Sequence, residues 1–152
     1  MDALNFDSKD EVIAAAIRFV EEKATYTSAT LDTAREAMDL LRLRIGDKEH
    51  EVFCVLYLNS QHQLIEVEEL FRGTIDGAAV YPREIAKGCL RTNAAACILG
   101  HNHPSGTTEP SAADKRITER ITSALGLLDI RVLDHVIVST DGALSFAQEG
   151  LM

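Results

Sequence analysis

The chain has 152 residues, of which 46% are hydrophobic and 26% are charged, so it fits one domain that buries its core without disulfides. Its formal net charge of −9 disfavours direct binding to nucleic acids, because contacts to phosphates depend on clustered Lys and Arg. The sequence has no apolar run of roughly 20 residues, no secretory leader pattern in its acidic N-terminus and no CxxC pair, and we therefore expect a cytoplasmic protein with reduced thiols and no membrane contact.

Two helices are predicted in the N-terminal part of the chain. The first covers residues 8–23, because Ser8 is a good N-cap residue and acidic residues follow it in the first turn. The second covers residues 31–43, where apolar residues recur on one face and Gly46 lies just past the end. We expect residues 1–46 to form an N-terminal helical part that packs on the rest of one globular unit.

After residue 50 the pattern of apolar residues changes from one typical of helices to one typical of strands. Residues 52–58 are continuously apolar, which is typical of a strand buried on both faces. Residues 59–62 form a turn, and residues 63–71 are predicted to be the return strand. Pro82 suits a first helical position and begins a helix that is predicted to end near Thr92.

Residues 94–100 fit either a helix or a strand by pattern alone. We interpret them as a central strand, because two histidines just beyond them align only if the following loop fans out from a strand end. A helix over 111–125 is followed by Gly126, and strands are predicted over 130–138 and 144–148. This order of elements predicts an α/β fold with a mixed central sheet flanked by helices.

The candidate metal ligands lie after the central strand. In an extended segment alternate side chains point the same way, so His101 and His103 present two imidazoles on one face. Asp114 can add a carboxylate from the start of the next helix. Two histidines, one carboxylate and an open position are the ligand set of a catalytic zinc centre rather than of a closed structural one. The pattern therefore predicts a hydrolase in which another acid acts on a metal-bound water.

Asp114 also has a purely structural interpretation. Ser111 stands where a helix N-cap belongs and Asp114 at the third helical position, close to the capping-box pattern. Since a helix N-terminus also stabilises a carboxylate, Asp114 can be oriented by the cap and still bind metal, and we interpret it as a ligand. His135 precedes an apolar strand and is interpreted as a core histidine rather than as a fourth ligand. Asn102 is interpreted as a loop residue that makes hydrogen bonds.

The segment His101-x-His103-Pro104-x6-Ser111-x2-Asp114 resembles the JAMM motif of JAB/MPN-domain zinc metalloproteases. Four wider motifs, at residues 81–85, 101–106, 110–114 and 134–137, are similar to the RadC-like branch, and the likeness covers about residues 47–150. This resemblance implies a JAB/MPN fold, of the cytidine-deaminase-like type, over residues 47–152. It also implies a short form that lacks the N-terminal helix-hairpin-helix domain of fuller RadC-like proteins.

The resemblance assigns further roles. Family members place a glutamate at the start of a strand well upstream of the two histidines, which makes Glu51 the expected general base. A simple charged strand cap is the alternative role for Glu51, and three other acids lie in the predicted return strand: Glu66, Glu68 and Glu69. The Ser111 hydroxyl is expected to stabilise the tetrahedral intermediate. Zn²⁺ is the implied metal, held by the two histidines and Asp114.

The predicted function is therefore that of a zinc-dependent hydrolase that cleaves a peptide or isopeptide bond in a protein or peptide substrate. A non-catalytic or accessory metal-binding protein in DNA repair or mobile-element transactions is the alternative, although the net charge weakens any version that binds DNA directly. A zinc deaminase is excluded, because the chain has no HxE…PCxxC set. His50 and His62 are expected at the surface.

Overall fold

The structure is a computed structural model that describes residues 5–26, 34–73 and 80–152. Its elements run in the order α1 (Lys9–Tyr26), α2 (Ala34–Ile45), β1 (Val52–Leu58), β2 (Leu64–Arg72), α3 (Pro82–Thr92), β3 (Ala96–Asn102), α4 (Ala112–Gly126), β4 (Arg131–Val138) and β5 (Ala143–Ser145). The predicted α/β class and the predicted order of elements are confirmed. Residues 31–33, at the start of the second predicted helix, lie outside the described residues. Within the described ranges, no helix combines the length and the apolar character that crossing a bilayer requires.

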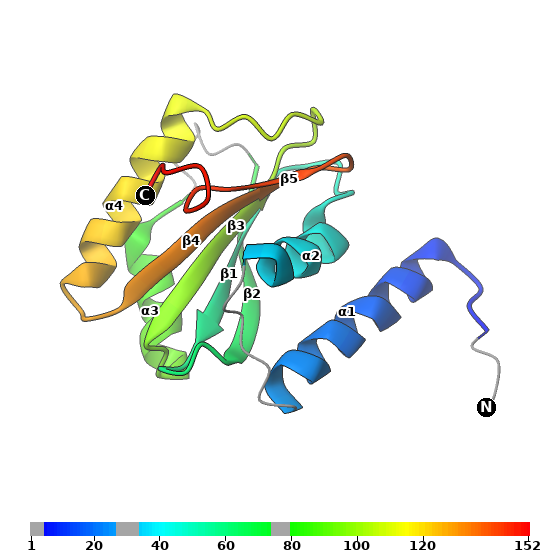
Figure 1. Cartoon of the computed structure of the whole chain (residues 1–152), viewed down its shortest axis with the longest axis horizontal. Helices are drawn as coiled ribbons and strands as arrows, with labels where there is room; N and C mark the ends of the chain where they lie inside the picture. The colour runs from blue at the N-terminus through cyan, green and yellow to red at the C-terminus, as the bar shows by residue number, and fades with distance from the viewer. Residues whose placement is uncertain (1–4, 27–33, 74–79) are drawn as a thin grey trace.

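A single five-stranded sheet has the spatial order β2-β1-β3-β4-β5. β3 and β4 pair in parallel and are connected through α4, whereas the other neighbouring strands are antiparallel. Figure 1 shows α2 on one face of the sheet, with α1 beside it, and α3 and α4 on the other face. The carboxyl end of β3 and the beginning of α4 consequently meet at one edge of the central sheet.

β1 separates two hydrophobic cores. All seven of its residues are buried, as the continuous apolar run predicted. Val52, Cys54, Leu56 and Leu58 pack toward α2, and Phe53, Val55 and Tyr57 pack toward α3 and α4. Each fully buried aliphatic or aromatic side chain stabilises the fold by about 1.5–3 kcal/mol relative to an exposed one, so both faces of this strand hold the layers together.

β3 extends two residues beyond its predicted end at residue 100, so His101 and Asn102 belong to the sheet. Gly100 explains how α2 approaches this part of the strand closely. A Cβ atom at this position would lie 2.6 Å from a methyl carbon of Leu41 on α2. The absence of a side chain at residue 100 therefore lets α2 cover β3 directly beside the first candidate ligand.

The last strand was predicted to run to residue 148, and this is wrong: β5 ends at Ser145. Side chains take the backbone N–H groups that a longer strand would have used. The Ala147 N–H donates to Oδ1 of Asp134 (3.0 Å), and the Gln148 N–H donates to the hydroxyl of Ser145 (3.2 Å). These bonds turn the chain back toward β4 and seat the buried Phe146.

Candidate metal centre

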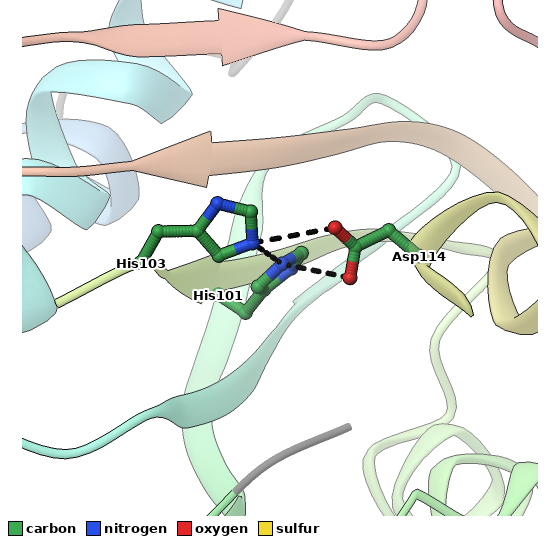
Figure 2. A group of neighbouring side chains, drawn as sticks. All are labelled: His101, His103 and Asp114. Carbon is green, nitrogen blue, oxygen red and sulfur yellow. Dashed lines mark hydrogen bonds and ion pairs between the residues drawn. The ribbon is translucent and has the colours of Figure 1, made fainter. Parts of the chain in front are cut away.

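Three side chains from two elements converge at the carboxyl end of β3. His101 lies on β3, His103 follows it directly, and Asp114 lies in the first turn of α4 (Figure 2). The Nε2 atoms of the two histidines are 2.9 Å apart. Nε2 of His101 is 3.2 Å from Oδ1 of Asp114, and Nε2 of His103 is 3.3 Å from Oδ2. The three residues that the sequence predicted as metal ligands thus form one cluster, compatible with a metal ion.

The separations in this cluster fit a tetrahedral ion. Zinc holds histidine nitrogens and carboxylate oxygens at about 2.0–2.2 Å, which places two ligand atoms at a tetrahedral angle roughly 3.3 Å apart. The three separations in the cluster are 2.9, 3.2 and 3.3 Å, of which the last two reach different oxygens of Asp114. Two nitrogens and one carboxylate oxygen leave the fourth position open, as in catalytic rather than structural zinc sites.

The hydrogen bond on the far side of His103 fixes which ring nitrogen is free. Nδ1 of His103 is 3.0 Å from the carbonyl oxygen of Thr107. A carbonyl can only accept, so Nδ1 carries the hydrogen and Nε2 keeps its lone pair. The backbone N–H of His103 also donates to the carbonyl of Val138 at 2.9 Å, which ties the residue to β4. His103 is therefore held ready to bind a cation through Nε2.

A buried chain of hydrogen bonds does the same for His101. The Thr118 hydroxyl donates to the carbonyl of Asp114 (2.6 Å), so its oxygen accepts from Nδ1–H of His135 (2.5 Å). Nε2 of His135 is then an acceptor, and it receives Nδ1–H of His101 at 2.7 Å. The lone pair of His101 Nε2 consequently points at Asp114. Two lone pairs and a carboxylate facing one small space repel one another unless a cation lies between them.

Burial and hydrogen bonding shape the charge of the cluster. Burial lowers the pKa of His101 and, more strongly, that of His135, so both rings are held neutral. The contact with Asp114 raises the pKa of His103 despite its partial burial. Burial alone would raise the pKa of Asp114, but its contacts with the two ligand histidines and the Ser111 N–H outweigh that effect and lower it well below the usual range. Asp114 is therefore a carboxylate at neutral pH, as a metal ligand must be.

Asp114 is both a helix cap and a member of the cluster. Its backbone N–H donates to the Ser111 hydroxyl at 3.0 Å, and its Oδ2 accepts the Ser111 N–H at 2.8 Å, which completes a capping box. The Ser111 hydroxyl uses a lone pair in this bond and keeps its hydrogen available to donate. The two interpretations of Asp114 are thus compatible, because a carboxylate has about four acceptor sites.

Asn102 positions the segment that contains Glu51. Its buried side chain accepts the Val52 N–H at 2.6 Å and donates to the carbonyl of His50 at 3.0 Å. Asn102 therefore makes hydrogen bonds as predicted, from the sheet rather than from a loop. Phe53 pairs with His101 across β1 and β3, and alternation places Glu51 on the same face as Phe53. The Glu51 charge opposes the effect of burial on the pKa of both ligand histidines, although its contribution is smaller than those of burial and of Asp114.

The other acids considered for the general base have different partners. Glu66 forms an ion pair with Arg91 at 2.5 Å, and Glu68 accepts the hydroxyl of Tyr57 at 2.7 Å. Glu69 is exposed on β2. Among the described residues, Glu51 is the candidate base whose charge acts on the cluster.

The contact between His135 and the cluster was not predicted. His135 is fully buried, which confirms the interpretation as a core histidine. It contacts His101 because β3 and β4 are parallel and Leu99 pairs with His135, so both histidines lie on one face. Only the register of that pairing could have shown this contact. Of the remaining histidines, His50 is exposed as expected, whereas His62 is partly buried in the turn between β1 and β2.

Comparisons with known proteins place this chain in a family. The family described as RadC-like JAB domain matches residues 31–151. A UPF0758 protein of Vibrio cholerae is 50% identical over 139 residues, which are 91% of this chain and 87% of that protein. UPF0758 proteins of Methylibium petroleiphilum and Thiobacillus denitrificans are each 52% identical. These alignments cover 80% and 90% of this chain, but it spans only 54% and 64% of the two relatives.

Proposed function

Because the chain belongs to the RadC-like JAB domain family, we propose that it is a zinc-dependent hydrolase that cleaves a peptide or isopeptide bond with a metal-activated water. The observation that carries this proposal is the convergence of His101, His103 and Asp114, whose two Nε2 atoms lie 2.9 Å apart and each within 3.3 Å of one carboxylate oxygen. Three protein ligands leave a position for water or substrate, which a closed structural site does not offer.

Zinc at this site would lower the pKa of a coordinated water to about 7 and polarise the scissile carbonyl. Glu51 is proposed to accept the proton of that water and to deliver it to the leaving amine. Its position beside the ligands is supported by the Asn102 hydrogen bonds to Val52 and His50, which hold the segment against β3. A base held within reach of a positioned water contributes roughly 10²–10⁴-fold to the rate.

Ser111 is proposed to donate its hydroxyl hydrogen to the oxyanion that develops on the substrate carbonyl. The residue is exposed, and its oxygen is already oriented by the Asp114 N–H. A donor that is fixed before the reaction needs no reorganisation when charge develops, and such a donor is worth about 2.7–4 kcal/mol of barrier. Ser111 would then act in both the helix cap and the reaction.

The proposal is tested with the zinc-loaded protein and the Glu51→Gln variant. Both are incubated with a library of linear peptides and a library of lysine-linked branched peptides, and cleavage is read by mass spectrometry of new amino termini. We expect Glu51→Gln to keep its zinc and lose at least 100-fold in cleavage rate. Glu49→Gln, an exposed neighbour with the same change of charge, is expected to retain both.

Unchanged cleavage in Glu51→Gln would move the general base to another residue. A wild-type protein that holds zinc but cleaves neither library contradicts hydrolysis and favours the accessory role. A His101→Ala/His103→Ala double variant serves as the metal-free control, since any cleavage that survives in it comes from a contaminating protease.

A further inference from the structure

A groove lies between the beginning of α3 and the outer face of α4, outside the metal cluster. It has a volume of about 780 Å³ and is open to solvent. Its lining includes Tyr81 and Arg83 from the start of α3, and Arg116, Glu119 and Arg120 from α4. All five residues are exposed, and Tyr81 keeps 47% of its surface in contact with solvent. An exposed aromatic ring among arginines is typical of a binding surface rather than of a core.

The charge of the groove is opposite to that of the whole molecule. Three arginines and one glutamate line it, whereas the chain has 24 acidic residues against 15 Lys and Arg. Arg83 lies over the Tyr81 ring at 5.5 Å and 4.0 Å from the carboxylate of Glu84. Within the described ranges, Arg116 and Arg120 have no ion-pair partner. Their guanidinium groups are therefore available to carboxylates of a ligand.

The groove lies on the side of α4 opposite the metal cluster, because two residues along a helix are about 200° apart and Arg116 therefore points away from Asp114. Arg116 follows Asp114 by two residues on the same helix, a rise of about 3 Å, and Arg120 lies about 6 Å farther along the axis. The other wall is connected to the cluster by aromatic contacts. Tyr81 packs on Phe71 (6.2 Å between ring centroids), Phe71 on Phe53 (6.1 Å), and Phe53 stacks on His101 (6.1 Å). These contacts pass through the buried Phe53, so they join the groove to the cluster through the core rather than along the surface.

We propose that this groove binds an acidic segment of the polypeptide substrate at a site separate from the metal. This inference rests on the proposed function. The lining residues on α4 extend from 116 to 124, which is about 12 Å and matches about four residues of an extended peptide. A short acidic peptide meets three arginines against the single Glu119, whereas a long nucleic acid would also extend over the rest of a molecule with a net charge of −9.

The test measures binding without turnover, in the Glu51→Gln protein. The probe is a fluorescein-labelled tetraglutamate peptide with an amidated C-terminus, and its tetraglutamine counterpart is the uncharged reference. We expect Arg116→Gln/Arg120→Gln to weaken tetraglutamate binding about tenfold, since each exposed pair contributes modestly. Arg18→Gln/Arg35→Gln is the matched control: it removes two exposed arginines from α1 and α2, on the other face of the sheet, and should leave binding unchanged.

Equal binding of the two peptides overturns the proposal, as does an equal loss in the control variant, which would reveal only the effect of net charge. A single-stranded oligodeoxythymidine serves as a further probe. If it binds through Arg116 and Arg120 and tetraglutamate does not, the groove binds a nucleic acid and the peptide proposal is wrong. Because Glu51→Gln is used throughout, a failure of hydrolysis leaves the binding result intact. The groove and the proposed function therefore fail separately.

Discussion

His135 provides the sharpest test of how the cluster is held. His135→Phe keeps a ring of similar size against Phe146, which stacks on it at 4.7 Å, but removes the acceptor of His101 Nδ1–H. The lost partner leaves a buried N–H without a hydrogen bond, which costs about 1–3 kcal/mol of stability. It also frees His101 to change tautomer or to rotate. Loss of such a supporting hydrogen bond typically weakens metal affinity about 10–100-fold, equivalent to roughly 1.4–2.7 kcal/mol.

The assay is competition for zinc with a chromophoric chelator, together with long-range ¹H–¹⁵N NMR spectra that report the tautomer of His101. His135→Gln should restore part of the affinity, because its amide oxygen can occupy the position of the imidazole Nε2. Ile137→Val, on the same strand, should cost about 0.5–1.5 kcal/mol of stability without changing zinc affinity. Unchanged zinc affinity in a folded His135→Phe protein, or an equal loss in Ile137→Val, refutes the argument that His135 orients His101.

Three further predictions concern the same site. The purified protein should contain about one zinc per chain by elemental analysis, and His101→Ala and His103→Ala should each lose it; full metal content in both variants excludes this site. Ser111→Ala should cost about 1 kcal/mol in urea unfolding and also slow turnover, whereas Ser8→Ala, which removes the oxygen that accepts the Glu11 N–H near the start of α1, should affect stability alone. If both serine variants change only stability, Ser111 is a cap and nothing more. The metal-free protein should lose stability as the pH falls below about 6.5. Burial lowers the pKa values of His101 and His135, so both histidines are protonated in the unfolded chain at a pH where they remain neutral in the folded chain. The raised pKa of His103 changes stability only above pH 6.5, because below this pH the ring is protonated in both the folded and the unfolded chain. Two protons therefore separate the two states, and the slope should approach roughly 2.7 kcal/mol per pH unit; a stability that is flat or rises on acidification contradicts this assignment.

Local patterns predicted the elements because each pattern has a local cause. The apolar run at 52–58 became a strand buried on both faces, and Ser111 with Asp114 became a helix start. The C-terminal end of β5 could not be predicted in this way, since Asp134, 13 residues away in sequence, accepts the N–H of Ala147. Contacts between distant residues decide where a short strand ends.

The same distinction divides the candidate site. Spacing and family resemblance predicted that the two histidines and Asp114 lie together, and the structure places them in one cluster. The contact of His135 with His101 depends on the register of a parallel pair of strands. The arginine-lined groove depends on how α3 packs beside α4, and neither helix alone contains it. Both features are properties of the assembled layers rather than of any one segment.

The choice between helix cap and metal ligand at Asp114 reduces to which acceptor sites are in use. Oδ2 accepts the Ser111 N–H, and Oδ1 faces Nε2 of His101. A cap alone explains the first contact but leaves the second as an approach of a carboxylate to a lone pair, because Thr118 and His135 fix the hydrogen of His101 on Nδ1. That approach is repulsive without a cation between the two atoms. A proton or a metal ion at this position would remove the repulsion, and burial, which lowers the pKa of His101, disfavours the proton, so the cluster is compatible with a metal ion.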